Sequence, residues 1–281
     1  DDEKIDQTYN LAGKVVMAGA IDMHTHIGGG KVNIARMMLP EDHRADPNEH
    51  THVCRSGCGP AAPSTLTTGY RYAEMGYTAA FEPALSTVNA RQSHLEMGDT
   101  PIIDKGGYAM IGSDDFFLRM LAAKKDQKAI NDYVALTVSN THSLGLKCIN
   151  PGGCESFKEN MRAFGLDDVV PFYGVTSRQI FQLLQKSTQA VGVPHPLHLH
   201  MNNLGIAGNI DTALQTIDAA EGLPLHLAHV QFYAYGLEGK HGFSSASARF
   251  AEKINANPNV SVDVGQVMFS DTVTISSYVL K

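Results

Sequence analysis

Pairs of histidines stand at the ends of three apolar runs of the sequence. The runs are GAIDMHTH, PLHLHMNN and LPLHLAHVQF, and the pairs are His24 and His26, His198 and His200, and His226 and His229. Side chains two positions apart on a strand point to the same side, so an H-x-H pair can present two imidazoles to one metal ion. A solvated strand edge is the more common explanation of an isolated H-x-H, and a satisfied core histidine is the preferred explanation of each later histidine alone, but three runs that end alike favour metal binding.

The position of each histidine in its run predicts its role. His24 and His26 close the first run, and His200 and His229 are the last histidines of the two later runs. His200 and His229 should lie nearest the mouth of the site and, together with the H-x-H pair, could supply the nitrogen ligands that zinc or a similar ion needs. His198 and His226 should lie deeper, as core groups or as groups that orient a ligand.

Lys147 is a lysine in the middle of a short apolar run, GLKCIN. Burial of an unpaired ammonium is costly, and desolvation lowers the pKa of a lysine towards a neutral amine. Such an amine can react with carbon dioxide to form a carbamate, whose two anionic oxygens could bridge two cations. A lysine that reaches the surface or pairs with a carboxylate fits the spacing equally well.

Strand-like and helix-like segments alternate along the chain and must position these residues. Apolar runs typical of strands cover 14–26, 78–83, 107–112, 145–150, 197–202, 224–230 and 259–267. Helix-like segments cover 65–75, 114–124, 129–139, 177–191, 209–220 and 244–257, with Ser177 as a possible cap and Gly192 after a helix end. This alternation is typical of a parallel sheet covered by helices.

Seven strands over about 250 residues predict a (β/α)8 barrel of the TIM type that lacks its eighth strand. A doubly wound open sheet is the alternative, but polar ligand-type residues at the ends of four strands favour the barrel. We expect residues 1–14 to be the end of a small accessory β-domain or a linker, and residues 15–281 to form the incomplete barrel. The stretch 28–63 is irregular and follows the first strand, which is the position of an active-site mouth.

Five polar residues near that mouth are candidate substrate contacts, although a solvated loop surface explains any one of them equally well. They are Lys31, Asn33, Arg36, Asn202 and Asn203.

The composition excludes several classes of protein. With 43% hydrophobic and 18% charged residues the chain can bury a large core, and its net charge of −7 argues against nucleic-acid binding. Cys54 and Cys58 could form half of a metal site, but no matching pair follows, so we expect these two and Cys148 and Cys154 to be free thiols. No signal peptide or membrane-length apolar run is found, so a cytoplasmic protein is expected.

GAIDMHTH, the mid-strand Lys147 and the histidines that close the next two strands resemble the amidohydrolase superfamily of metal-dependent barrels. Longer strings are similar to the A subunits of formylmethanofuran dehydrogenases and of formyltransferase/hydrolase complexes. They are HTHIGGGKVNIARMMLPEDHR, RSGCGPAAPSTLTTGYRYAEMGYTAAFEPA, LKCINPGG, HLHMNNLGIAGN and HLAHVQFYAYG.

The resemblance implies two divalent ions, most often zinc. His24 and His26 would bind one ion, carboxylated Lys147 would bridge the two, and His200 and His229 would bind the second. The remaining ligand of the family is an aspartate after the eighth strand, which also transfers the proton, so the catalytic carboxylate is expected beyond residue 281. Asp263 and Asp271 lie on or just past the seventh predicted strand and are not assigned this role.

The implied reaction is hydrolysis of the N-formyl group of formylmethanofuran or formylmethylofuran, which releases formate, or the reverse reaction. The implied partners are a subunit of the formyltransferase type and other members of a multi-subunit cytoplasmic complex. A cyclic-amide hydrolase of the dihydroorotase or hydantoinase kind would have a similar metal site, and only the longer strings favour the formyl carrier. A scaffold subunit without activity is the third possibility, and metal content measured together with hydrolysis would separate it from the enzymes.

Overall fold

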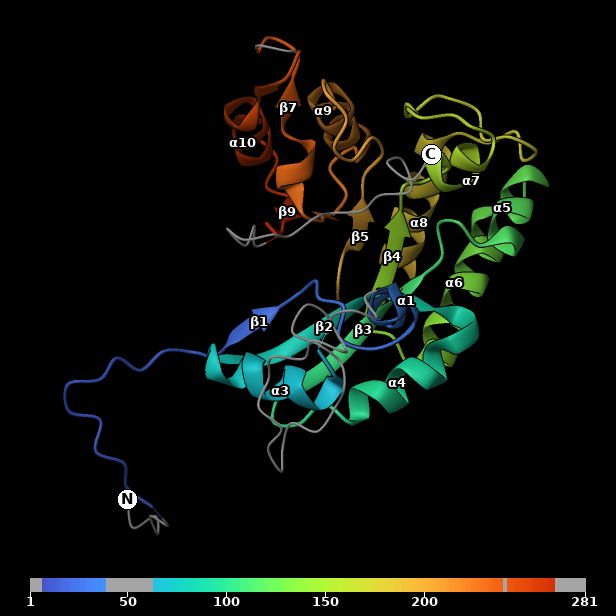
Figure 1. Ribbon diagram of the computed structural model, residues 1–281. Helices are drawn as coiled ribbons and strands as arrows, with labels where there is room; N and C mark the ends of the chain where they lie inside the picture. The colour runs from blue at the N-terminus through green and yellow to red at the C-terminus, as the bar shows by residue number, and fades with distance from the viewer. Residues whose placement is uncertain (1–6, 39–62, 240–241, 266–281) are drawn as a thin grey trace.

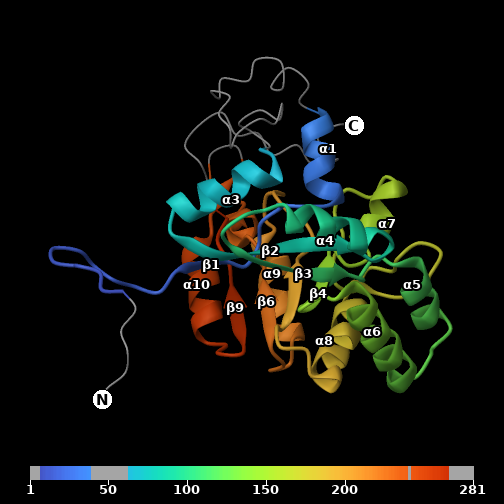
Figure 2. The same cartoon turned by 90° about the horizontal axis from the view of Figure 1, so that it is seen from below.

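The computed structural model describes residues 7–38, 63–239 and 242–265. Cys54, Cys58 and Asp271 lie outside these residues, and so does most of the predicted mouth loop. The predicted division of the chain near residue 14 stays a prediction. Residues 7–19 carry no helix or strand and extend away from the rest of the described chain in both views (Figures 1 and 2).

Within the described ranges, seven parallel strands form one sheet, and each pairs with the next strand of that sheet along the chain. They are β1 (Ala20–Asp22), β2 (Tyr77–Ser86), β3 (Asp104–Met110), β4 (Gly145–Ile149), β5 (Leu197–His200), β6 (Leu225–Leu227) and β9 (Val260–Val262). Two further strands, β7 (Tyr235–Gly236) and β8 (Ser244–Ser245), form a short antiparallel pair. The sheet is an incomplete barrel, as predicted, and within the described residues no eighth strand joins β1 to β9.

Helices follow most of the strands and lie around the sheet (Figure 2). They are α1 (Gly30–Met38), α3 (Thr65–Glu74), α4 (Ala90–Gly98), α5 (Asp115–Ala122), α6 (Gln127–Thr141), α7 (Gly153–Lys158), α8 (Ser177–Val191), α9 (Ile210–Ala219) and α10 (Ser247–Asn255), with the short 3-10 turns η1 (Thr87–Asn89) and η2 (Val230–Tyr233). The carboxylates of Asp114 and Asp126 cap α5 and α6 by accepting from backbone N–H groups at 2.8 Å. Gly192 ends α8 in the left-handed conformation, with φ of 74°.

Three details of the sequence prediction are wrong. The first predicted strand begins only at Ala20, because residues 14–19 meet no neighbouring strand in the described chain, and Val15 is 90% exposed. Ser177 is the first residue of α8 rather than its cap; Thr176 and Gln179 form the capping box instead. The stretch 28–63 also contains the helix α1, which the sequence pattern does not indicate.

Two separate clusters of buried apolar side chains support the sheet. The major core packs strands β3 to β6 and β9 against α5, α6, α8, α9 and α10, and includes Phe117, Phe181 and Leu199. The minor core beside β2 consists of Ile27, Ala80, Leu85, Met97 and Ile103. In the part of the chain that the structure describes, no helix is long and apolar enough to span a membrane.

Candidate metal centre

A row of polar side chains crosses four adjacent strands at one level of the sheet. In the parallel register, Lys147 of β4 lies opposite His198 of β5, His198 lies opposite His226 of β6, and His226 lies opposite Ser261 of β9. His200 lies two residues beyond His198, nearer the carboxyl ends of the strands, and is opposite Ile149 of β4. The strand register therefore sets two levels of histidines within the sheet.

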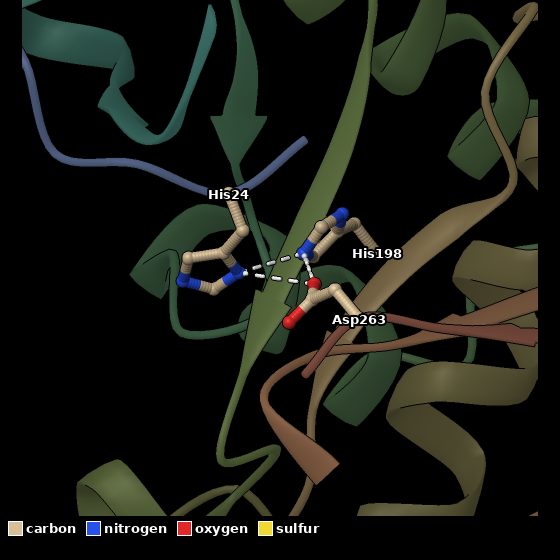
Figure 3. Close-up of side chains that lie close together, drawn as sticks. All are labelled: His24, His198 and Asp263. Atoms are coloured by element: carbon tan, nitrogen blue, oxygen red, sulfur yellow. Dashed lines mark hydrogen bonds and ion pairs between the residues drawn. The ribbon is translucent and has the colours of Figure 1, made fainter. Parts of the chain in front are cut away.

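His24, His198 and Asp263 form the innermost cluster (Figure 3). His24 Nδ1 lies 2.9 Å from His198 Nε2 and 3.6 Å from Asp263 Oδ2, and His198 Nε2 lies 3.5 Å from the same oxygen. Lys147 Nζ lies 3.5 Å from His24 Nδ1, and His226 Nε2 lies 3.0 Å from Asp263 Oδ2. This group of two imidazoles and a carboxylate could hold a metal ion.

A second histidine pair lies at the outer level. His229 Nε2 lies 2.9 Å from His200 Nδ1, and the backbone N–H of His229 donates to Asp263 Oδ1. His229 has a left-handed backbone, with φ of 37° and ψ of 55°, which is unfavourable for a residue with a side chain. Its Nδ1 atom is buried and has no hydrogen-bond partner among the described residues.

All five predicted metal ligands line one cavity of about 650 Å³: His24, His26, Lys147, His200 and His229. The apolar part of the lining, here called the apolar wall, comes from α7, the segment after it and the segments that follow β5 and β6. Its side chains include Phe157, Met161, Phe164, Leu204 and Phe232. No Asp or Glu is among the described residues that line the cavity.

Burial favours the neutral form of four imidazoles and of the Lys147 amine. It lowers the pKa values of His24, His198, His200 and His229, and for His229 the pKa falls to about 3. Burial also lowers the pKa of Lys147 to about 7, against the opposing charge of Asp263. In its neutral form an imidazole or an amine keeps a lone pair available to a cation or to carbon dioxide.

For the Asp263 carboxylate, hydrogen bonds together affect the pKa more than burial does. Burial raises its pKa, but hydrogen bonds from His226, His24 and the backbone of His229 outweigh burial and hold the pKa below its usual range. An anionic carboxylate thus faces neutral nitrogen donors, and the Nδ1 atom of His229 has no other partner in the described chain. This donor set fits a divalent ion such as zinc.

The five candidate substrate contacts lie in three different places relative to the cavity. Lys31 and Asn203 line the cavity. Asn33 and Arg36 do not line it; they lie on α1, where the Arg36 guanidinium donates to the Asn33 side chain at 2.8 Å. Asn202 is 1% exposed and donates to a backbone carbonyl and a hydroxyl at 3.2 and 2.9 Å, so the structure gives it a supporting position.

The innermost cluster includes two residues outside the predicted ligand set, His198 and Asp263. His198 could have been placed from its spacing, because it precedes His200 by two positions and must point to the same side of β5. No local pattern marks Asp263, since its partners His24 and His226 are far away in the sequence.

The sequence profile of the Amidohydrolase family matches residues 7–280. The chain belongs to this family. It is 43% identical, over 98% of its length and 50% of the relative's, to the A-type subunit of the formyltransferase/hydrolase complex Fhc of Methylorubrum extorquens. It is 36% identical to the protein named FwdA of Methanocaldococcus jannaschii, over 95% of this chain and 49% of that one.

A solved structure gives the same family relationship. The formyltransferase/hydrolase complex FhcABCD of Methylorubrum extorquens, determined by X-ray crystallography in complex with methylofuran, contains a chain that matches with a TM-score of 0.91 and 42% identity. The match covers all of this chain and 51% of that one. The resemblance found in the sequence is therefore confirmed, and the chain spans about half the length of the relatives that it matches.

Proposed function

We propose that the protein hydrolyses, or in reverse forms, the N-formyl amide of a furfurylamine-type carrier such as formylmethanofuran or formylmethylofuran. It would do so in the cytoplasm, within a complex that also contains a subunit of the formyltransferase type. The observation that carries this proposal is the 43% identity to a subunit of a formyltransferase/hydrolase complex over 98% of the chain. The cavity is lined by both polar and apolar side chains, which supports the proposal because an amide on a carrier with an aromatic ring needs both.

The residues that would hold metal are the five ligands predicted from the sequence, with two divalent ions, zinc by preference, and with Lys147 carboxylated between them. When bound, the ions would polarise the formyl carbonyl and make a water molecule more acidic. His198 and Asp263 would orient His24 rather than bind metal, because both contact His24 but neither lines the cavity.

Other residues of the chain would bind the substrate and limit access of water. Phe157 and Phe232 line the apolar wall, where a flat ring can pack. Lys31 and Asn203 are the polar groups of the cavity that we assign to substrate binding. We do not assign proton transfer to Asp263, since three histidines contact it and it does not line the cavity.

An assay on the full-length protein in its complex tests the function. Formylated carrier should release formate, and the activity should disappear with a chelator and return with zinc. Stoichiometric metal without formate release would favour the scaffold alternative. Release of product from dihydroorotate or hydantoin, and not from the formyl carrier, would favour the cyclic-amide hydrolase.

Carboxylation of Lys147 has its own test. A crystal structure of the metal-loaded protein should show three additional heavy atoms beyond Nζ. A bare amine beside two occupied metal positions would contradict this part of the proposal while leaving formate release as a separate question.

A further inference from the structure

Glu82 is a carboxylate on β2 that is 1% exposed and lies directly behind His26. Its Oε1 atom accepts from the backbone N–H of Ala84 at 3.1 Å and lies 2.8 Å from His26 Nδ1. Its Oε2 atom accepts from the backbone N–H groups of Ile27 and Gly28 at 2.9 and 3.3 Å. Three of these four partners are backbone N–H groups, which can only donate, so the Glu82 side chain accepts in all three of those bonds.

This contact determines which nitrogen of His26 carries the proton. A carboxylate oxygen 2.8 Å away requires a hydrogen on Nδ1. The lone pair of a neutral His26 therefore lies on Nε2. His26 lines the cavity and its side chain is 43% exposed, so Glu82 fixes the imidazole from its buried side and leaves the opposite side open.

His24 has no such support from a glutamate among the described residues. Its Nδ1 atom faces both His198 and the Asp263 carboxylate inside the cluster, and its backbone N–H donates to Asp22 at 3.0 Å. The two histidines of the H-x-H pair are thus held differently. His26 is the one whose orientation depends on a single buried carboxylate.

We propose that Glu82 is a positioning residue that presents Nε2 of His26 to a metal ion. The inference rests on the proposed function, in which His26 is a ligand. When the ring nitrogen that does not bind metal donates a hydrogen bond to a carboxylate, this bond orients the imidazole and raises its basicity. Loss of this bond weakens metal binding without removing a ligand.

A purely structural role for Glu82 is the competing explanation, because the same carboxylate holds three backbone amides. Glu96 provides the matched control. Its Oε2 atom accepts from the backbone N–H of Gly29 and its Oε1 atom from the Asn33 side chain, both at 2.7 Å, so it holds the same loop. These two bonds tie Glu96 to the loop and not to the imidazoles, and Glu96 does not line the cavity.

The experiment compares Glu82→Gln with Glu96→Gln in the full-length protein. Zinc affinity is measured by competition with a chromogenic chelator, and the thermal unfolding of the metal-free form is measured in parallel. Glu82→Gln should weaken the affinity about 10- to 100-fold. Glu96→Gln should keep the affinity of the unsubstituted protein even if both variants lose thermal stability. Equal affinity of both variants would overturn the inference.

A thermodynamic cycle separates action through His26 from a general loosening of the loop. In the His26→Ala background, Glu82→Gln should cost no further zinc affinity, because the residue through which it acts is gone. An equal loss in both backgrounds would assign Glu82 to the loop alone. Absence of zinc from the unsubstituted protein would instead refute the proposed function, so the two failures are distinguishable.

A measurement without any substitution covers the case in which Glu82→Gln does not fold. A crystal structure of the zinc-loaded protein should show His26 bound through Nε2, with Nδ1 still within hydrogen-bond distance of Glu82. Metal bound through Nδ1 of His26 would overturn the inference.

Discussion

The two cores of the molecule hold the candidate metal centre in different ways. On the side of the major core, Lys147 and His198 are at most 1% exposed and stand in strands whose other side chains, such as Leu146 and Leu199, are fully buried. On the side of the minor core, His24 and His26 follow a strand of three residues and their side chains are 15% and 43% exposed.

Packing fixes the residues of the first group, and hydrogen bonds fix those of the second. The segment after β1 is held by Glu82 and Asp22 and by the backbone N–H of Thr25, which donates to Phe81 of β2 at 3.0 Å. Tyr72 supports it from α3. The comparison indicates that substitutions near the major core should change the site and the stability strongly, whereas those near the minor core should mainly change orientation.

The largest expected effect is that of Lys147→Ala. Loss of the amine removes the carbamate that would join two ions, and we expect formate release to fall by at least about 10³-fold, comparable to the loss of a principal catalytic group. The measurement is formate release together with zinc content. Acetate added at high concentration should restore part of the activity, because it can supply two oxygens in the space that the side chain leaves.

Lys105→Ala is the control for that substitution. Lys105 lies on β3, does not line the cavity, and donates to the carbonyl oxygen of Thr100 at 2.7 Å. Its loss should leave formate release and zinc content unchanged. Full activity of Lys147→Ala would show that the buried lysine is only a core residue.

The next largest effect is the loss of stability caused by a large-to-small substitution in each core. Phe181 belongs to the major core and is fully buried, so Phe181→Ala should lower the free energy of unfolding by about 3–5 kcal/mol. Met97 belongs to the five-residue minor core, where neighbours can relax into the space, so Met97→Ala should cost about 2 kcal/mol. Urea denaturation measures both values. Equal losses of unfolding free energy in the two variants would contradict the view that the major core is packed more tightly than the minor core.

Much of this arrangement can be predicted from the sequence. The periodicity of apolar residues places the seven strands of the sheet, and the cavity brings together the five predicted ligands. Period-2 alternation and burial explain this success, because both follow from the local sequence. The capping box of Thr176 and the start of β1 at Ala20 show where local rules are less exact.

What could not be predicted depends on contacts between distant segments. The parallel register places His198 level with Lys147, and the cluster is completed by Asp263, 239 residues after His24. Glu82 has no sequence pattern that links it to His26, since the contact forms only when β2 lies beside the segment after β1. Register and packing between strands are set by the whole fold.

A smaller effect is expected from the hydrogen bond that Tyr72 donates to Asp22 at 2.7 Å. Asp22 in turn accepts from the backbone N–H of His24, so Tyr72→Phe should disturb the orientation of the H-x-H segment. We expect a loss of about 1 kcal/mol in unfolding free energy and a decrease in formate release of less than tenfold, which corresponds to about 1.4 kcal/mol. Chemical denaturation and the formate assay measure the two quantities.

Tyr133→Phe is the matched substitution on the side of the major core. The Tyr133 hydroxyl donates to the Asp114 carboxylate at 2.8 Å, a bond of the same kind outside the site. Its removal should cost a similar stability and leave formate release unchanged. Activity losses of equal size in Tyr72→Phe and Tyr133→Phe would mean that hydrogen bonds on the β1 side have no special part in orienting the ligands.

Backbone strain occurs both inside and outside the site. His229 has a left-handed backbone and supplies an imidazole to the cavity, so there the strain accompanies a functional group. Ile102 lies beside the minor core, is 66% exposed and has φ of 74°, and Phe172 is 89% exposed with φ of 67°. Neither of these two residues lines the cavity, so relief of their strain should affect stability alone.

The smallest expected effect is an increase in stability, in contrast to the losses predicted above. Left-handed backbone is costly for Phe172 and more so for the β-branched Ile102, whereas asparagine tolerates it. Ile102→Asn should raise the unfolding free energy by about 0.5 kcal/mol, and Phe172→Asn by less, as measured by urea denaturation. Formate release should not change in either variant. A decrease in stability for both would show that the exposed side chains make stabilising contacts that outweigh the strain.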